Sequence, residues 1–255
     1  MPTARRKTDL NQILDILYLN EIAESTARPR IISYPYPMSF TVRNPKISDL
    51  AAILEVEKSW PESGRAGADK FTARIQKFAQ GFFLVCTTLP DGTEKVVGTI
   101  TSMPLRYDPS LVGQFTSWDH VTHHGMLDDC SLKDKNALYI ISGVIDKEYR
   151  GENIFGLGVL SVVKHAQSIG MRYVIAGAVI PGYRKYCQNF GELPAWDYCQ
   201  LHKGSKLVDP LLAMYESIHF KVPNKLHVVQ EYYPDDASRN YAALVVRDLS
   251  IHPVG

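Results

Sequence analysis

Residues 136–160, NALYIISGVIDKEYRGENIFGLGVL, combine residue types that can hold a phosphate group. Strand-forming residues occupy positions 138–145, a charged turn occupies 146–150, and a glycine-punctuated helix follows. Backbone amides at a helix start have no intrahelical partner and lie at the positive end of the helix dipole, so they attract anions. Arg150 adds a fixed positive charge in a planar fork that suits phosphate. The pattern predicts a pyrophosphate held by the turn, with the rest of a long ligand lying along the strand.

The end of this strand is a second chemical feature. Gly143 precedes Val144 and Ile145. A glycine inside a strand marks a bulge or a splayed edge, where backbone amides are left unpaired. We therefore expect a bulge or splay at Gly143 and free amides beside the ligand.

The stretch resembles the central motif of the GNAT superfamily of acyl-CoA-dependent N-acyltransferases, V-x-x-x-x-x-R/Q-x-x-G-x-G/A. Counted without gaps, Val144 and Arg150 fit this motif, whereas Asn153 and Phe155 replace its two glycines. Asn153 tolerates the left-handed backbone that such a turn requires. Phe155 places bulk where backbone should approach the phosphate. We therefore expect its ring to turn into the core, or CoA binding to be weakened or altered.

A gapped alternative places Gly156 and Gly158 on the two glycine positions and Asn153 where the motif has Arg or Gln. It adds three residues to the loop, and it leaves the helix too short to reach Ala166 and Gly170 in the usual register. The ungapped alignment is therefore preferred.

The resemblance covers most of the chain, from Ser39 onward. ISDLAAILEVE resembles the first helix of the family, VVGTI its third strand, and MYESIHF its Y-x-x-x-G-F helix end. The resemblance implies an α/β (mixed α+β) fold, with a central mixed and twisted sheet, helices on both faces, and splayed fourth and fifth strands. In the family, pantetheine lies between these two strands like an extra strand. Here they correspond to residues 137–145 and 172–179.

The resemblance also implies a co-substrate, acetyl-CoA or another acyl-CoA, and the residues that bind it. The positions that it assigns to the CoA site are Val144, Ile145, Arg150, Gly151, Glu152, Asn153, Ile154, Phe155 and Gly156. The acyl donor is either free acyl-CoA or pantetheine on a carrier.

Direct acyl transfer to an amine needs a base or water chain for the amine proton, a donor to the thioester oxygen, and an acid for the leaving thiolate. By resemblance, the backbone amide of Val144 is the donor and Tyr215 is the acid. The alternative for Tyr215 is a core aromatic on the apolar stripe of its helix. No base is identified, because the strand offers Tyr139 and Ser142 and no carboxylate. Deprotonation then runs through water, the acceptor arrives neutral, or the reaction is a different one.

The leading hypothesis is an enzyme, an acyl-CoA-dependent N-acyltransferase that moves an acyl group directly to the amine of a small-molecule acceptor. The C-terminal part also resembles GNAT-like domains of polyketide loading modules, which decarboxylate malonyl thioesters and acylate an acyl carrier protein. In that alternative His219 acts with Thr99 or Thr101, although the histidine is displaced by one residue. A non-catalytic acyl-CoA sensor is the third hypothesis, which Phe155 and the missing base favour.

Three histidines in HVTHH, His120, His123 and His124, invite a metal site. They lie in a polar loop with no cysteine partner and no helical register. We therefore expect a solvated loop and no metal.

The composition of the 255 residues is that of an ordinary globular protein, with a net charge of +1. No global field recruits nucleic acid or a membrane surface, so neither partner is expected. Four cysteines lack CxxC spacing, which suits a reducing cytoplasm. No apolar run approaches the roughly 18 residues of a membrane span. The N-terminus is basic and then amphipathic, which does not indicate a secretory signal.

The scaffold for these residues is expected in the order β-α-α-β-β-β-α-β-α-β-β, from SFTVR to YAALVVRDL. Ser48 is a plausible N-cap of the first of these helices, and LPDGT is the strongest hairpin signal. Residues 1–36 are expected to form a helical appendage and a proline-rich connector. Its helix either covers the core or makes a homodimer contact. Residues 37–255 are expected to form the acyltransferase domain.

An insertion at about 182–208 is long for the connection between a strand and the next helix. It contains five aromatic residues, Tyr183, Tyr186, Phe190, Trp196 and Tyr198. Its length and aromatic content predict that it forms a lid or a wall of the acceptor pocket. A partly helical structural insertion is the alternative.

Overall fold

A seven-stranded mixed sheet forms the centre of the described residues, which are 39–111, 113, 115–150 and 153–254 of the computed structural model. Its strand order is β1-β2-β3-β4-β5-β9-β8, and a two-stranded hairpin, β6-β7, lies apart from it. The strands are β1 (Phe40–Arg43), β2 (Phe82–Thr88), β3 (Glu94–Leu105), β4 (Ala137–Ile145), β5 (Tyr173–Val179), β6 (His202–Lys203), β7 (Lys206–Leu207), β8 (Val228–Val229) and β9 (Ala242–Asp248). The α-helices are α2 (Leu50–Glu57), α3 (Ala68–Phe78), α4 (Trp118–Thr122), α5 (Ile154–Ser168), α6 (Tyr183–Phe190), α7 (Ala195–Cys199) and α8 (Pro210–Ser217).

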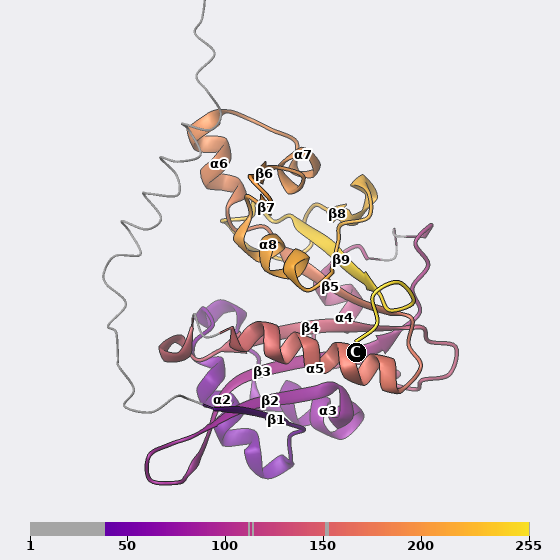
Figure 1. The fold of residues 1–255 in the computed structure, drawn as a ribbon. Coiled ribbons are helices and arrows are strands. Elements are labelled where there is room, and N and C mark those ends of the chain that lie inside the picture. Colours follow the sequence, from indigo (N-terminus) through magenta and orange to yellow (C-terminus); the bar gives the residue numbers. More distant parts are fainter. Residues whose placement is uncertain (1–38, 112, 114, 151–152, 255) are drawn as a thin grey trace, which may run out of the picture.

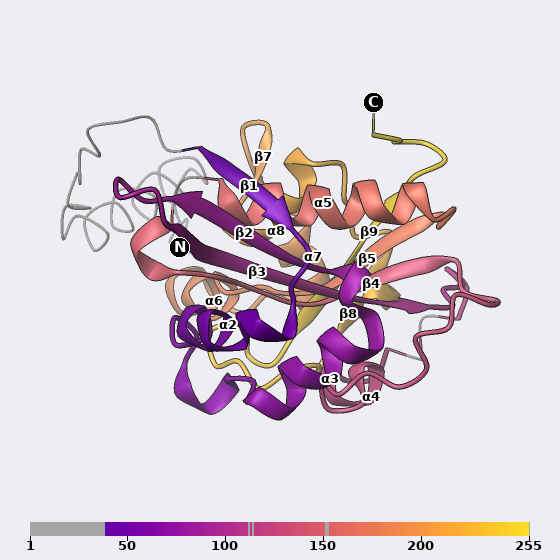
Figure 2. The ribbon, with the colours of Figure 1, turned by 90° about the horizontal axis from the view of Figure 1, so that it is seen from below.

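Helices cover both faces of the sheet. Helix α5 lies on one face, against β2, β3 and β4, whereas α2 lies on the other, against β3 and β4 (Figure 2). Figure 1 shows α6, α7 and α8 on the half of the molecule that carries β5 and β9. The predicted α/β architecture, with a mixed sheet between helices, is therefore confirmed.

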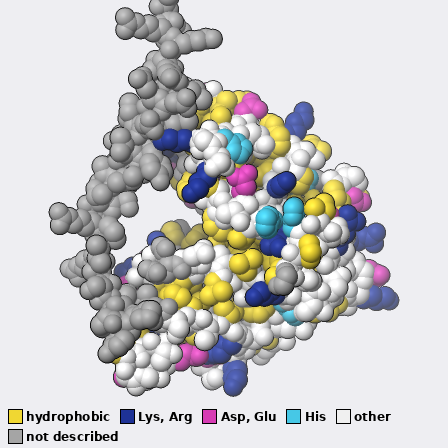
Figure 3. All heavy atoms as spheres, in the orientation of Figure 1, with side chains coloured by type: hydrophobic (Ala, Val, Ile, Leu, Met, Phe, Trp, Pro, Cys, Tyr) yellow, Lys and Arg dark blue, Asp and Glu magenta, His cyan; other side chains and the backbone are white. Residues whose placement is uncertain are grey.

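Strands β4 and β5 are the one parallel pair of this sheet, and they separate partway along their length. Residues 137–140 of β4 pair with residues 173–176 of β5, and the pairing ends there. Beyond that point β4 continues beside β3 as far as Ile145, and β5 continues beside β9 as far as Val179. The surface is notched between the half that carries α6 and α8 and the half that carries α5, and hydrophobic side chains gather in the notch (Figure 3). The predicted splay is present, and it begins after Ile140.

The bulge in β4 is not at Gly143, as the sequence suggested. Thr101 of β3 faces Ser142 and Ser102 faces Ile140, so Ile141 is the extra residue. Gly143 keeps regular register opposite Ile100. A regular ladder at Gly143 means that this glycine serves close packing instead of a register shift.

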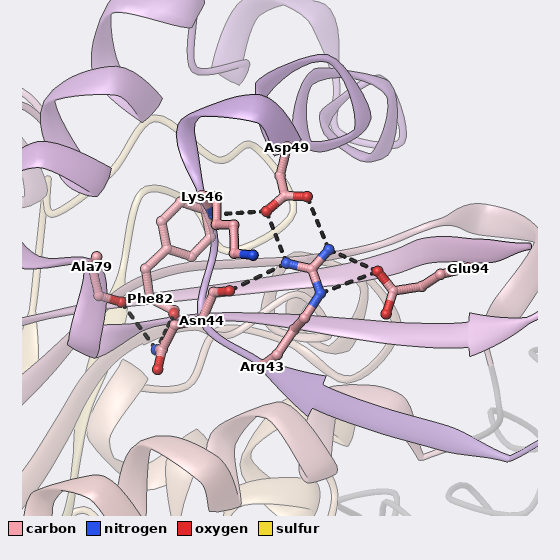
Figure 4. A network of polar contacts seen from close by, with 7 residues as sticks. All are labelled: Arg43, Asn44, Lys46, Asp49, Ala79, Phe82 and Glu94. Carbon is pink, nitrogen blue, oxygen red and sulfur yellow. Dashed lines mark hydrogen bonds and ion pairs between the residues drawn. The ribbon is translucent and has the colours of Figure 1, made fainter.

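The first helix begins differently from the prediction that Ser48 is its N-cap. A short 3-10 turn, Ile47–Asp49, precedes α2, and the carboxylate of Asp49 accepts a hydrogen bond from the Lys46 amide (2.7 Å). The same carboxylate forms a two-bond pair with the guanidinium of Arg43 (2.8 and 2.9 Å), which also binds Glu94 (2.7 Å) (Figure 4). The Asp49 side chain therefore closes the 3-10 turn before α2 and ties that turn to β1 and β3, and it makes no capping bond to α2 itself.

Three other segments depart from their expected structure. The sequence predicts a polar loop at residues 106–135, which contains the short helix α4, and a strand at KLHVVQEYY (225–233), of which only the two-residue β8 forms. The insertion at 182–208 contains α6, α7 and the β6-β7 hairpin, and Tyr183, Cys187 and Tyr198 are buried. It is therefore a packed structural element, which was the alternative interpretation.

The predicted N-terminal appendage lies outside the described residues. Among the residues that are described, no helix is long and apolar enough to cross a membrane.

Candidate functional site

The gap between β4 and β5 exposes one side of the β4 backbone. The amide of Asp146 donates to the carbonyl of Val97 (2.9 Å), and this bond shows which residues of β4 direct their amides toward β3. Because successive residues of a strand direct their amides to alternate sides, Val144 faces β3, and Gly143 and Ile145 face the gap. The carbonyl of Ile141 also points away from β3, since it accepts from Trp118 Nε1 (2.8 Å). The register therefore gives the gap-facing amides to Gly143 and Ile145 and not to Val144.

The turn after β4 uses most of its own amides. The amide of Glu148 donates to the Asp146 side chain (3.1 Å), that of Tyr149 to the Asp146 carbonyl (2.9 Å), and that of Lys147 to Ser59 Oγ (3.1 Å). Arg150 Nη2 donates to the Ser59 carbonyl (2.9 Å) from an exposed position. The turn is thus fastened to the end of α2, and its arginine is already oriented.

The start of α5 leaves its first amides without intrahelical partners. Asn153 precedes the helix with φ of 56°, in the left-handed region, as the ungapped alignment requires, and its side chain makes no capping bond. The first amide bonded within the helix is that of Leu157, to the carbonyl of Asn153 (3.1 Å). The amides of Ile154, Phe155 and Gly156 have no partner among the described residues, so an anion can take them. Gly151 and Glu152, two of the predicted CoA-site residues, lie outside the described residues.

Phe155 bridges the two halves of the molecule. A Cβ added at Gly143 would lie 2.5 Å from Phe155 Cε2, so the ring covers this part of β4. The ring also packs edge-on against Tyr215 of α8, with centroids 6.0 Å apart. Any chain that enters the gap from the start of α5 must pass this half-buried ring.

Tyr215 lies next to Phe155 and is itself 3% exposed. Its other aromatic neighbour is Phe220, at 5.2 Å. Burial first, and then the nearby Tyr139, raise the pKa of the Tyr215 phenol, so it stays protonated at neutral pH. A protonated phenol can donate to an anion that forms beside it.

Tyr139 of β4 has a hydrogen-bond partner on a distant segment. The hydroxyls of Tyr139 and Tyr232 are hydrogen-bonded to each other, and both side chains are buried. Tyr232 packs on Gly177 of β5, where a Cβ would collide with its ring. The two tyrosines therefore join β4 to the β8–β9 loop where the gap begins. No local pattern signals this pair, because the residues are distant in sequence.

His219 does not lie at the gap. It is exposed, and its ring stacks on His252 at a centroid distance of 4.9 Å. Its φ of 66° explains why the resembling motif has glycine here, since the helix ends in a left-handed residue. Thr99 and Thr101 lie opposite Val144 and Ser142 in the β3–β4 ladder. The histidine and threonines of the decarboxylase hypothesis are therefore not brought together.

A polar group lies on the α3 side of the gap. Arg74 of α3 donates from Nη1 to Ser142 Oγ (3.1 Å) and from Nε to the Gly125 carbonyl (3.0 Å). Ser142 Oγ is 2.8 Å from Thr101 Oγ1. Burial lowers the pKa of Arg74 to about 10. No local sequence pattern signals this group, because its members come from four separate segments.

The histidines of HVTHH lie in α4 and the turn after it. His123 and His124 are exposed and lie 3.7 Å from Asp128 and 3.3 Å from Asp119, respectively. No group of three potential metal ligands is found within the part of the chain that the structure describes.

The insertion contributes to a hollow of about 510 Å³ near the open end of β5. Its lining residues are Tyr183, Glu192, Leu193, Pro194, Gln230, Arg239 and Tyr241. Arg239 pairs with Glu192 (2.6 Å) across this hollow.

Comparison with known proteins identifies the fold. The sequence matches no protein-family model and no curated protein. The structure is similar to the loading GNATL domain of CurA from Lyngbya majuscula (TM-score 0.68, 22% identity, covering 84% of this chain and 100% of that one). It is also similar to the GphF GNAT-like decarboxylase in complex with isobutyryl-CoA (TM-score 0.65, 19% identity, 82% and 99%). Arabidopsis thaliana NAA60 in complex with acetyl-CoA matches at a TM-score of 0.52 (15% identity, 82% and 99%).

The protein therefore has the GNAT fold, as the strand–turn–helix motif indicated. At these identities the likeness concerns the fold, and the chemistry of the site has to be argued from its own residues.

Proposed function

We propose that this protein is an acyltransferase that takes its acyl group from acyl-CoA, or from pantetheine on a carrier, bound between β4 and β5. The observation that carries the proposal is the separation of these strands after Ile140, which leaves the amides of Gly143 and Ile145 facing the gap. An extended chain with amide groups can pair with that edge as a further strand would. The solved structures that share the fold and contain acetyl-CoA or isobutyryl-CoA support this choice of ligand.

The rest of the donor is assigned to the turn and to α5. The pyrophosphate lies over residues 150–156, where Ile154, Phe155 and Gly156 offer free amides and Arg150 offers charge. The predicted CoA-site residues Gly151 and Glu152 stand between Arg150 and Asn153 in the sequence. Because α5 is 15 residues long, its dipole adds to the attraction. Val144 contributes its side chain to the core under the gap.

Tyr215 is the proposed acid for the departing thiolate. Its protonated, buried phenol lies beside Phe155, at the side of the gap opposite β4. The gap-facing amide of Gly143 or Ile145 is the proposed donor to the thioester oxygen, in place of Val144. No carboxylate has been identified as a base, so we propose that water removes the amine proton.

The proposed acceptor is the amine of a small molecule. The second candidate is decarboxylation of a malonyl thioester followed by transfer to an acyl carrier protein. It is favoured by the likeness to the CurA loading domain and the GphF decarboxylase over nearly their full lengths. Against it stands His219, which lies on the surface beside His252.

Mass spectrometry separates these functions in one experiment. The protein is incubated with acetyl-CoA or malonyl-CoA, in the presence and absence of a mixture of small amines. An acylated amine and free CoA are expected. Release of CO2 from malonyl-CoA without an acylated amine would instead favour the decarboxylase. Calorimetric binding of acetyl-CoA with neither product would identify a sensor, and no binding at all would overturn the proposal.

A further inference from the structure

Arg74 is a buried cation with unused hydrogen-bonding capacity beside the gap. Its side chain is 1% exposed, and it donates only to Ser142 Oγ and the Gly125 carbonyl. A guanidinium has five N–H donors, so three of them have no hydrogen-bond partner among the described residues. Within the same residues no carboxylate pairs with it. Its guanidinium lies over the Phe71 ring at 5.1 Å, but this contact uses none of the N–H donors, and a buried charge without a hydrogen-bonded counterion is costly.

Two other arginines show how such a charge is usually satisfied. Arg247 is 3% exposed, and it makes four hydrogen bonds to the carbonyls of Ile218, His252 and Pro253. Arg43 is held by the carboxylates of two acidic residues. Arg74 has neither arrangement within the described residues, so a bound ligand is a candidate for its partner.

The position of Arg74 connects it to the proposed reaction. Ser142 belongs to the part of β4 that has separated from β5. On the other side, a Cβ added at Gly125 would lie 2.8 Å from Arg74 Nη2 and 2.8 Å from the Trp118 ring. The absence of a side chain at Gly125 therefore makes room for the guanidinium. Trp118 in turn binds the Ile141 carbonyl at the edge of the gap (2.8 Å).

The charges near Arg74 are of both signs, but none of them takes its remaining donors. Lys70 lies over the Trp118 ring at 5.9 Å. Glu57 and Asp69 interact with Arg74 electrostatically, yet among the described residues neither forms a hydrogen bond or an ion pair with it. The Glu57 carboxylate accepts from the Ala66 amide (2.8 Å) instead. The remaining N–H donors of Arg74 are therefore left for an anion.

We propose that Arg74, together with the hydroxyl of Ser142, binds a carboxylate of the substrate on the α3 side of the gap. This inference rests on the proposed acyltransferase function and adds the substrate class. The planar guanidinium fork matches a carboxylate through two parallel hydrogen bonds. The carboxylate belongs either to the acyl group, as in a dicarboxylic acyl-CoA, or to an amino-acid-like acceptor.

The test measures carboxylate preference in the full chain. For the donor, calorimetry compares succinyl-CoA and malonyl-CoA with butyryl-CoA and acetyl-CoA. For the acceptor, product formation from acetyl-CoA compares amino acids with their amides. One class is expected to prefer the carboxylate by about 10- to 150-fold, the range for a hydrogen bond to a charged group. Arg74→Met should remove that preference and retain binding of acetyl-CoA.

Two further variants keep the result interpretable. Arg74→Lys retains the charge without the fork and should keep part of the preference if Arg74→Met does not fold. Arg247→Met removes an equally buried arginine of β9, which lies opposite Val174 near the start of β5. This variant should leave the carboxylate preference intact. Loss of the donor preference identifies a dicarboxylic acyl group, and loss of the acceptor preference identifies an amino-acid-like acceptor. If acetyl-CoA binds but no carboxylate is preferred, or if Arg74→Met keeps the preference, this inference is wrong and the acyltransferase proposal stands. If no acyl-CoA binds, both fail.

Discussion

The two parts of β4 have the same neighbour on one side and different surroundings on the other. Residues 137–140, the closed half, lie between β3 and β5, and Ala137, Leu138 and Tyr139 are fully buried. Residues 141–145 are the open half, in which residues 142–145 pair with β3 alone and Ile141 is the bulged residue. The closed half has a neighbouring strand on both sides, whereas the open half presents amides to a gap. The comparison suggests that the closed half maintains the fold and that the open half binds the ligand.

The largest expected effect is a loss of turnover, caused by a substitution in α8 that changes neither half of β4. Tyr215→Phe removes the proposed acid and keeps the ring that packs on Phe155 and Phe220. General acid catalysis typically contributes about 10²–10⁴-fold, so we expect kcat to fall by that factor with CoA affinity unchanged. Steady-state kinetics and calorimetry measure the two quantities. Tyr173→Phe, at the far end of β5, is the matched control, and parental turnover in Tyr215→Phe would reduce Tyr215 to a core aromatic.

A substitution in the closed half should affect stability alone. Leu138 is fully buried in the main core, and Leu→Ala at such a site costs about 2–5 kcal/mol. We expect the free energy of unfolding of Leu138→Ala to fall by this amount in urea, while the folded fraction binds acetyl-CoA as before. A large loss of affinity in folded protein would contradict the division between the two halves.

A charge reversal beyond the open half should affect binding and leave stability nearly unchanged. Arg150 is exposed and bonds only to the Ser59 carbonyl among described residues. Arg150→Glu places a negative charge beside the proposed pyrophosphate, so we expect CoA affinity to fall by about tenfold or more. Calorimetry compares it with Arg172→Glu, an exposed arginine at the closed end of β5. Equal affinities in the two variants would place the pyrophosphate elsewhere.

The smallest expected effect lies outside both halves, in the network of Figure 4. The hydrogen bonds from Arg43 hold the pKa of Asp49 below its ordinary value. A carboxyl whose folded-state pKa is lowered stabilises the fold above its unfolded pKa, near 4, and loses that contribution as pH falls through the folded pKa. Asp49→Asn should therefore lower stability by up to about 1 kcal/mol at pH 7, and the difference from the parent should shrink below about pH 4.

Thermal unfolding across pH checks this last prediction. Glu55→Gln breaks an exposed ion pair with Lys58 and should change stability very little. CoA affinity should be unchanged in both variants. A deficit of Asp49→Asn that stayed constant down to pH 2 would show that the ion pair is not its cause.

Local sequence patterns were sufficient for most of the scaffold. The alternation in β2 and β3 and the turn between them predicted a hairpin, and Asn153 was expected in the left-handed conformation that it adopts. The beginning of the splay was not predictable, because it depends on where β5 leaves β4 to follow β9. The extra residue Ile141 was equally hidden.

The same limit applies to the candidate site. Val144 was expected to donate its amide to the thioester oxygen. Successive residues of a strand direct their amides to opposite sides, so a difference of one residue decides whether an amide faces the gap or β3. Trp118, Tyr232 and Arg74 reach the gap from segments far apart in the chain. Their roles depend on tertiary contacts that leave no periodic signal in the sequence.

The central claim is that acyl-CoA pairs with the open half of β4, and amide hydrogen exchange measured by NMR tests it residue by residue. Without ligand, the amides of Gly143 and Ile145 should exchange faster than that of Val144, which faces β3. Saturating acetyl-CoA should slow exchange at Gly143 and Ile145 and leave Leu138 of the closed half unchanged. Bound acetyl-CoA with unaltered exchange at Gly143 and Ile145 would contradict the account.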